Sequence, residues 1–240
     1  SPFPAAVMIT GSGPQDRDET IIGHKPFAVI ADYLTRRGIA VLRFDDRGVG
    51  QSTGNYGAAT SADPATDANA AADYLMTRPD IRHDAIGFIG HSEGGMIGPI
   101  AMAGNPKIAF LVMMAGPGTG LEQLMLSQRR LVGSQMGQSE LALDRAEPIM
   151  KAVFEAVKNA ATPEAGREAA RAVLTSTAMT LLGAPGAKPE ILLDQVTGPW
   201  FSYFLKYDPA PNLSRIKVPI LALDGSLDRQ VPPEDNLAAI

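Results

Sequence analysis

Cysteine is absent from all 240 residues of the chain. Disulfides, cysteine-ligated zinc or iron–sulfur sites and a cysteine nucleophile are therefore excluded. Histidine is also scarce, with three residues, which is few for a metal enzyme. Aromatic side chains make up only 6% of the chain, so the core must be built mainly from aliphatic residues and methionine.

Basic residues are also fewer than acidic residues. The chain has 21 Lys and Arg against 26 Asp and Glu, a net charge of −5, which argues against a dedicated nucleic-acid binder. No apolar run is long enough to span a bilayer, so we expect a soluble chain in a compartment that the sequence leaves open. Hydrophobic residues at 45% and charged residues at 20% are ordinary for a globular domain.

The two ends of the sequence lack the usual start and stop signals. Ser1 is followed almost at once by a strand-like run, with no initiator methionine and no signal-peptide pattern. Residues 236–240 have a helical pattern without a cap or stop signal. From these features we expect a fragment or processed product that is truncated at its C-terminus.

Short apolar runs alternate with helical patterns over most of the chain. The order of these elements predicts an α/β fold with a mostly parallel sheet and helices on both faces. Strands are expected at residues 5–9, 39–44, 85–89, 108–115 and 218–223, and helices at 27–37, 64–77 and 94–103.

The pattern changes between residues 117 and 212, where no strand-like run occurs. Helices are expected at 121–132, 140–160, 163–182 and 190–205. We interpret residues 117–212 as a helical cap inserted between a first core segment, 1–116, and a continued but incomplete core, 213–240. A separate helical domain is the alternative, and the strand predicted at 218–223 favours the insertion.

The strongest chemical motif is the hexapeptide GHSEGG at residues 90–95. It lies between a predicted strand and a predicted helix, which is the context of a nucleophile elbow. Ser92 must occupy a tight turn, so the residues two positions away, Gly90 and Gly94, must lack a Cβ that would clash. The helix N-terminus then faces the hydroxyl and favours a developing negative charge.

With this motif the chain resembles the α/β-hydrolase superfamily, and within it the bacterial esterases related to dienelactone hydrolases and prolyl-oligopeptidase-like enzymes. The resemblance covers most of the chain and rests on four stretches: TGSGPQDRD at 10–18, RFDDRGVGQS at 43–52, GHSEGG at 90–95 and LDGSLDRQVP at 223–232.

The resemblance implies roles for particular residues. Ser92 is the nucleophile, and the backbone N–H groups of Ser12 (or Gly13) and Glu93 form the oxyanion hole. Asp228 is the triad acid, with Asp224 as its competitor, which we interpret as a turn residue. No metal or organic cofactor is implied.

The triad histidine should follow the acid in the chain, and no histidine follows Asp228. In relatives, the residue at the position of His91 points away from the serine. His83 precedes its strand, at the wrong end of the sheet, and His24 is in the wrong order and is expected to brace structure. We therefore expect the triad histidine beyond Ile240, and little activity from the 240 residues alone.

Several other polar residues are assigned structural roles. The polar residues at 15–18 are expected to brace the glycine loop through a local hydrogen-bonded network. Asp45 and Arg47 are also expected to be structural, because the Lys and Ser/Thr of a phosphate-binding loop are missing.

Apolar side chains of the cap would suit an acyl or aryl group, or would simply pack the cap, and both interpretations stay open. They are Leu124, Met125, Leu131, Met136, Met150, Trp200, Phe201, Tyr203 and Phe204.

The sequence thus predicts a serine hydrolase that cleaves small-molecule carboxylic esters through an acyl-enzyme. A peptidase, thioesterase or acyltransferase of the same fold is the first alternative, although no acidic pair for a substrate amino terminus is evident. The second is a non-catalytic binding domain that kept the elbow but lost the base. The oligomeric state and the physiological ester are left open.

Overall fold

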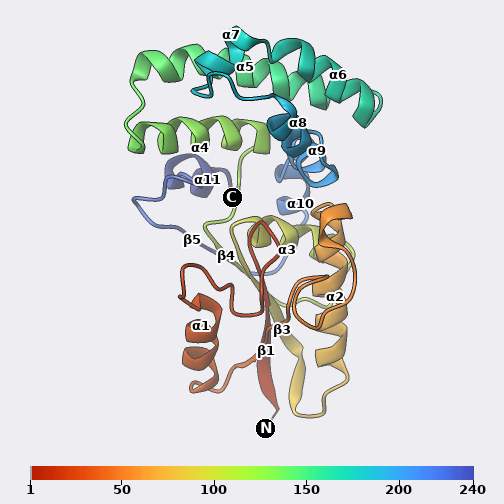
Figure 1. Cartoon of the computed structure of the whole chain (residues 1–240). Helices are drawn as coiled ribbons and strands as arrows, with labels where there is room; N and C mark the ends of the chain where they lie inside the picture. The colour runs from red at the N-terminus through yellow and green to blue at the C-terminus, as the bar shows by residue number, and fades with distance from the viewer. Residues whose placement is uncertain (1) are drawn as a thin grey trace. The chain divides into compact units, whose positions relative to one another are not determined.

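The computed structural model describes residues 2–240 and divides the chain into two compact units. Unit 1 comprises the chain up to Gly118 together with Pro209–Ile240, and unit 2 comprises Thr119–Asp208 (Figure 1). Unit 2 falls inside the predicted insertion, 117–212. Its role as a cap stays a prediction.

Unit 1 is built on a five-stranded sheet in the order β2-β1-β3-β4-β5, in which every neighbouring pair is parallel. This confirms the predicted α/β class. The strands are β1 (Phe3–Ile9), β2 (Ala40–Leu42), β3 (Ile81–His91), β4 (Leu111–Met114) and β5 (Ile220–Leu223). Strand β1 and residues 85–90 of β3 are apolar because both faces of the sheet are covered there.

Helices lie on both faces of this sheet (Figure 1). They are α1 (Pro26–Thr35), the short 3₁₀ helix η1 (Tyr56–Ala58), α2 (Ala62–Met76), α3 (Glu93–Ala103), α10 (Ala210–Leu213) and α11 (Pro233–Ala239). Helices α2 and α3 pack on one face, where the larger apolar cluster of unit 1 includes Ala68, Ile97 and Phe88. Helix α1 packs on the other face through Phe27.

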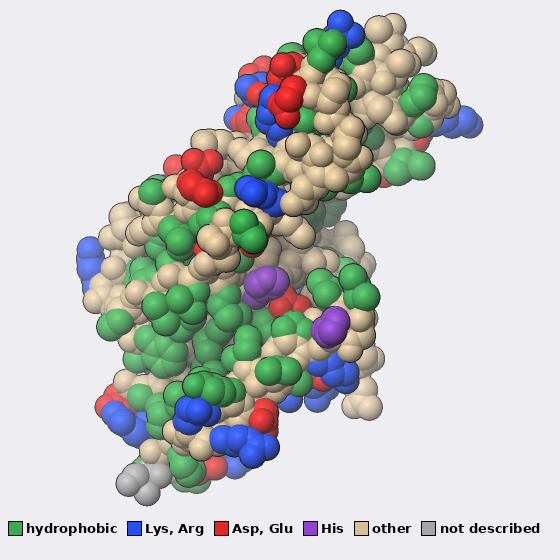
Figure 2. Space-filling view, turned by 90° about the vertical axis from the view of Figure 1, so that its left-hand side faces the viewer, with side chains coloured by type: hydrophobic (Ala, Val, Ile, Leu, Met, Phe, Trp, Pro, Cys, Tyr) green, Lys and Arg blue, Asp and Glu red, His purple; other side chains and the backbone are tan. Residues whose placement is uncertain are grey.

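The α1 face of the sheet is covered unevenly. Leu221 and Leu223 of β5 pair with Val112 and Met114 of β4, and these two leucines are 52% and 48% exposed. Figure 2, which looks onto the α1 side, shows hydrophobic side chains gathered on the surface of the unit that carries the N-terminus. Residues 1–240 on their own therefore present apolar surface at this edge of the sheet.

Unit 2 is helical throughout its described length. Its helices are α4 (Leu121–Gln135), α5 (Glu140–Lys158), α6 (Pro163–Val173), α7 (Ser176–Leu181), α8 (Glu190–Val196) and α9 (Pro199–Lys206). No helix in the described part of the chain is long and apolar enough to cross a membrane.

Two of the predicted helices, 163–182 and 190–205, are wrong because each is divided in two. The hydroxyl of Thr175 accepts a hydrogen bond from the N–H of Ala178 and so caps a new helix, α7. In the second case Gly198 is extended and Pro199, which has no N–H, occupies the first turn of α9. Both divisions are set by capping residues that the apolar periodicity does not reveal.

Four of the nine apolar side chains that could have lined an acyl pocket are buried in unit 2 itself. Met150 and Phe201 belong to its central cluster, and Phe201 packs against Phe154 with ring centroids 5.6 Å apart. Leu124 and Phe204 are also buried, whereas Met136 is 78% exposed. For the buried members, packing of the unit is the interpretation that the structure favours.

Candidate active site

Ser92 lies at the turn between β3, which ends at His91, and α3, which begins at Glu93. Its backbone has φ 52° and ψ −118°. A positive φ of this kind is rare for residues other than glycine. Such strain persists only where the surroundings enforce it, and it clusters at functional sites. The turn therefore has the local geometry of a nucleophile elbow.

The glycines of the motif are required by close backbone contacts. A Cβ on Gly90 would lie 2.1 Å from the carbonyl oxygen of Gly94, and a Cβ on Gly94 would lie 2.2 Å from that of Ile9. Gly95 has a similar constraint, because a Cβ there would come within 2.7 Å of Gly116 Cα. The strand, the turn and the helix can approach this closely only without side chains.

The glycine-rich loop after β1 lies directly beside the elbow. Strands β1 and β3 are parallel neighbours, so their carboxyl ends meet at the same edge of the sheet. A Cβ built on Gly11 would lie 3.2 Å from the Cβ of Ser92 and 3.2 Å from Glu19 Oε1. The loop is thus packed against the serine side chain.

Alternate amides of this loop have partners within the protein. The N–H of Gly11 donates to Glu19 Oε1 at 2.6 Å, and the N–H of Gly13 donates to the Tyr56 hydroxyl at 2.9 Å. The N–H of Gln15 donates to Asp46 Oδ2 at 2.9 Å. Ser12 is exposed, and no hydrogen bond within the described chain engages its amide. These contacts count against Gly13 as an oxyanion donor.

Glu93, the residue after the serine, opens α3 with its side chain buried at 3% exposure. The hydroxyl of Ser61 donates to Glu93 Oε1 at 2.5 Å. Because the side chain is anchored in the interior, the backbone of the first turn of α3 is fixed where the helix dipole is positive.

His91 is paired with a carboxylate. Its Nδ1 lies 2.9 Å from Oε1 of Glu19, which is 2% exposed and has a left-handed φ of 51°. The hydrogen bond to Glu19 raises the pKa of His91 above its ordinary value, and the charge of Asp228 contributes to the rise.

The network predicted to brace the loop is confirmed. The Arg17 guanidinium donates to both carboxylate oxygens of Asp45, with the shorter contact at 2.7 Å. The hydrogen bonds from Arg17 hold the pKa of Asp45 at about 2. Asp16 accepts from the hydroxyl of Thr20 at 2.7 Å, and Asp18 pairs with Arg43.

The structural roles predicted for Asp45 and Arg47 are also confirmed. Arg47 forms ion pairs with Asp63 at 3.2 Å and Asp67 at 2.9 Å, which tie the loop after β2 to α2. Asp45 accepts from Arg17, and its carbonyl accepts from the hydroxyl of Ser52.

The buried carboxylate of Asp46 links the loop after β2, in which it lies, to the loop after β1. It accepts from the hydroxyl of Thr10 at 2.8 Å and from the N–H of Gln15 at 2.9 Å. Burial raises its pKa to about 6, despite these two hydrogen bonds.

This raised pKa predicts a stability that declines as the pH rises. The pKa of Asp46 is about 6 in the folded state and 3.8 in the unfolded state. The contribution of Asp46 to the free energy of unfolding is therefore fully present below the unfolded-state pKa and is lost as the pH rises through the folded-state pKa. Between about pH 4 and pH 7 we expect the free energy of unfolding to fall by up to about 3 kcal/mol relative to Asp46→Asn. Denaturant titrations of both proteins across this range measure the difference, and parallel curves would contradict it.

Asp224 and Asp228 follow β5 at the same edge of the sheet as the elbow. Asp228 Oδ1 accepts from the N–H groups of Gln230 at 2.7 Å and Val231 at 3.0 Å. Asp224 accepts from the adjacent N–H of Gly225 at 2.7 Å, and burial together with the neighbouring Asp228 raises its pKa.

The other two histidines make their contacts outside the serine turn. His83 is near the start of β3, at the opposite end of the strand from Ser92, and its Nε2 is 3.2 Å from the carbonyl oxygen of Arg78. His24 is exposed, and its backbone forms an isolated bridge with Ile21. In the described chain no group of three or more acidic or histidine side chains is arranged to hold a metal ion.

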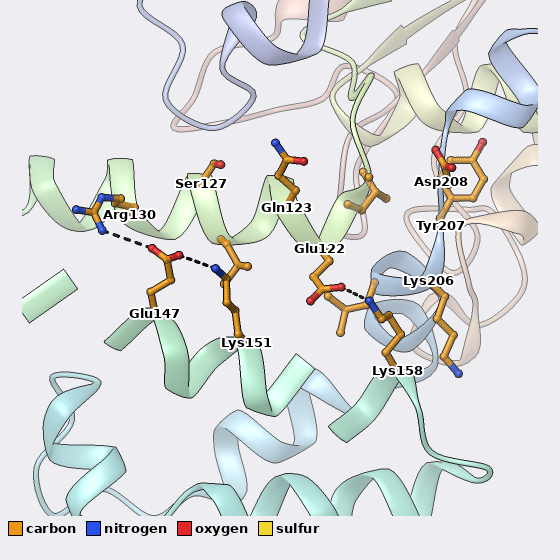
Figure 3. A pocket seen from close by; sticks show the side chains of 14 residues that line it. Glu122, Gln123, Ser127, Arg130, Glu147, Lys151, Lys158, Lys206, Tyr207 and Asp208 are labelled. Carbon is orange, nitrogen blue, oxygen red and sulfur yellow. Dashed lines mark hydrogen bonds and ion pairs between the residues drawn. The ribbon is translucent and has the colours of Figure 1, made fainter. Parts of the chain in front are cut away.

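A cavity of about 750 Å³ lies within unit 2 (Figure 3). Several of its charged side chains form ion pairs: Glu147 pairs with Arg130 of α4 and with Lys151 of its own helix, and Glu122 pairs with Lys158. The remaining labelled lining residues are Gln123, Ser127, Lys206, Tyr207 and Asp208. Leu121, Leu126 and Leu205 also line this cavity, so its wall combines charged and apolar side chains and is not the purely apolar acyl pocket expected for the cap.

Glu19, Tyr56, Ser61 and Asp46 are the site-supporting residues that the sequence did not single out. Glu19 directly follows the polar run 15–18, and Asp46 lies in the stretch 43–52. The sequence motifs therefore indicate the loops that contain these two residues. Tyr56 and Ser61 carried no such signal, because their contacts with Gly13 and Glu93 depend on tertiary structure.

Comparison with known proteins agrees with this architecture. Residues 25–239 match the protein family described as serine aminopeptidase, S33. The chain is 30% identical over 235 residues to Esterase EstD of Thermotoga maritima, across 98% of this chain and 49% of that protein. It thus spans about half the length of this curated relative.

Solved structures share the fold at low sequence identity. The α/β hydrolase GrgF of Penicillium sp. sh18 superposes with a TM-score of 0.58 at 19% identity, over 99% of this chain and 76% of that chain. Est1E of Butyrivibrio proteoclasticus, solved with ferulic acid bound, gives 0.56 at 18% identity, over 99% and 75%. The elbow, the parallel sheet and the match over residues 25–239 together identify the chain as a member of the serine aminopeptidase S33 family, with the α/β-hydrolase fold.

Proposed function

We propose that this chain carries the nucleophile, the oxyanion hole and the acid of a serine esterase. Ser92 Oγ attacks the ester carbonyl, and the N–H groups of Ser12 and Glu93 bind the resulting oxyanion. A histidine takes the serine proton and passes it to the leaving alcohol, which gives an acyl-enzyme that water then hydrolyses. Asp228 orients that histidine.

The observation that carries this proposal is the packing of the strained serine turn against the glycine loop. A serine held at φ 52° with Gly11 against its side chain is poised between a helix N-terminus and a loop with an uncommitted amide at Ser12. Two backbone donors beside a serine hydroxyl form an arrangement that stabilises the oxyanion of acyl transfer. The name of the relative EstD and the bound ferulic acid in Est1E support an ester as the substrate class.

Asp228 is the better acid of the two aspartates. A triad carboxylate must be held in a fixed orientation, and two backbone N–H groups hold Oδ1 of Asp228. Asp224 has one such donor, the N–H of the adjacent Gly225, so it is the poorer candidate.

The base is proposed to be a histidine outside residues 1–240. His91 Nδ1 is engaged with Glu19, His83 lies at the far end of β3, and His24 is an exposed loop residue. Residues 1–240 alone should therefore turn over esters slowly, because an unassisted serine hydroxyl is a weak nucleophile.

A fluorophosphonate probe and short p-nitrophenyl esters test the proposal. We expect the polypeptide with its natural downstream sequence to be labelled at Ser92 and to hydrolyse p-nitrophenyl acetate, and residues 1–240 alone to be far slower. Turnover by residues 1–240 at a typical enzymatic rate, about 1 to 10³ per second, would overturn the assignment of the base. His24 and His91 would then be the residues to replace.

A peptidase is the second candidate, because the matched family is described as a serine aminopeptidase. Aminoacyl p-nitroanilides separate the two: an aminopeptidase cleaves them with a preference for a free amino terminus, and an esterase does not. Thioesterase and acyltransferase activities are tested with acyl thioesters and with added alcohol acceptors. A binding domain would show neither labelling nor turnover.

Replacing Asp228 with asparagine should impair catalysis more than binding. The expected result is a loss of about 10²- to 10⁴-fold in kcat with a smaller change in KM, because the carboxylate orients the base without attacking the substrate. Asp224→Asn is the matched comparison and should cost much less. A larger loss for Asp224→Asn than for Asp228→Asn would reverse the assignment of the acid.

A further inference from the structure

We propose that Glu19 and His91 are positioning residues that clamp the oxyanion loop onto the nucleophile elbow. The inference rests on the proposed esterase function and assigns a specific task to a pair that takes no part in the acyl-transfer steps above.

One carboxylate oxygen makes both contacts. Glu19 Oε1 accepts the N–H of Gly11 at 2.6 Å and lies 2.9 Å from His91 Nδ1. The imidazole carries a proton at Nδ1 in its charged form and in one neutral tautomer, so it can donate this bond in either state.

Each of the two partners of Glu19 lies next to a proposed catalytic group. Gly11 immediately precedes Ser12, the proposed oxyanion donor, and His91 immediately precedes Ser92, the proposed nucleophile. The Glu19 oxygen therefore joins the residue before the donor to the residue before the nucleophile. A displacement of either segment would change the distance between the Ser12 N–H and the carbonyl under attack.

The loop is anchored on the other side of Ser12 by different elements. Gly13 is held by Tyr56, and Gln15 is held by Asp46. Of these three anchors, the Glu19 contact is the one that extends to the elbow, through His91. It is therefore the anchor expected to set the position of the loop relative to Ser92.

The fold keeps Glu19 in an unfavourable setting. Its side chain is 2% exposed, and its φ of 51° is a left-handed value that is strained for a residue with a Cβ. A buried carboxylate must also be compensated by hydrogen bonds. The two donors that compensate it are those of the loop and the elbow, which is the arrangement that a positioning role requires.

Steady-state kinetics of position-19 variants test the clamp in the polypeptide with its natural downstream sequence, with p-nitrophenyl acetate as substrate. Glu19→Ala removes the shared acceptor, and we expect kcat to fall by about 10- to 100-fold with KM changed by less than about threefold. Glu19→Gln retains an amide oxygen that can accept from both donors. It should recover kcat to within about fivefold of the wild type.

Position 91 gives an independent pair of variants. His91→Ala should lower kcat in the same way, and His91→Asn, whose amide N–H can replace Nδ1, should restore most of it. If circular dichroism shows that Glu19→Ala does not fold, the variants at the half-exposed position 91 test the clamp instead.

Asn69→Ala is the control for a loss of stability alone. Asn69 donates to the carbonyl of Ala101 at 3.0 Å and accepts from Asn105, at the end of α3 away from Ser92. We expect this variant to lower the melting temperature and leave kcat unchanged. Glu19→Ala and His91→Ala with wild-type kcat would overturn the clamp, as would a failure of both conservative variants to restore activity.

The wild type separates the two proposals. If it is labelled by the fluorophosphonate and hydrolyses the ester while the variants match it, the clamp fails and the esterase assignment stands. If the wild type neither labels nor turns over, the esterase assignment fails, and the clamp fails with it.

Discussion

Replacing Ser92 with alanine is expected to abolish the proposed ester hydrolysis in the polypeptide with its natural downstream sequence. The expected loss in kcat is at least about 10⁴-fold, because no acyl-enzyme can form without the hydroxyl. Fluorophosphonate labelling should vanish at the same time. The fold should be unaffected or slightly stabilised. The substitution removes only the hydroxyl group, and the geometry of the turn is set by its neighbours.

The control for this experiment is a second serine-to-alanine change. Ser134 is exposed on α4, and its replacement should leave both turnover and labelling at wild-type levels. Mass spectrometry of the labelled peptide identifies the modified residue directly. Retained turnover in Ser92→Ala, with probe attached to a different serine, would remove the basis of the proposed mechanism.

Replacing Gly94 with alanine will prevent unit 1 from folding normally. The new Cβ would lie 2.2 Å from the carbonyl oxygen of Ile9 and 2.7 Å from that of Thr10, and both are backbone atoms that cannot rotate away. Strand β1 would have to shift from α3, which would open the central contact of the unit. We expect a loss of at least about 3 kcal/mol in the free energy of unfolding, or no folded protein at all.

Gly104→Ala provides the matched comparison. Gly104 caps the other end of the same helix at φ −102°, and the nearest atom to a Cβ there, the carbonyl oxygen of Ala101, is 3.8 Å away. Its stability should stay within about 0.5 kcal/mol of the wild type. Thermal and denaturant unfolding of both variants measure the contrast. A Gly94→Ala protein as stable as Gly104→Ala would show that the strand and helix can separate without cost.

The elbow could be predicted from sequence because its causes are local. Ser92, Gly90 and Gly94 lie within one turn, and the need for glycine arises from backbone atoms that any strand–turn–helix unit brings together. The alternation of apolar runs with helical patterns likewise predicted the parallel sheet. The helical division at Thr175 was missed because a capping hydrogen bond overrides a continuous apolar pattern.

The supports of the site were decided by tertiary structure alone. Glu19 is 72 residues from His91, and Gly13 is 43 residues from Tyr56, so no spacing in the chain marks either pair. The Glu19–His91 contact exists because β1 and β3 are adjacent and parallel, which brings the loop after β1 against the turn after β3. Tyr56 reaches Gly13 from the segment after β2, the other parallel neighbour of β1. The sequence by itself determined which turn presents the serine, since that depends on backbone sterics within a few residues. Which carboxylate would hold the neighbouring loop in place depended on strand order, a property of the whole sheet.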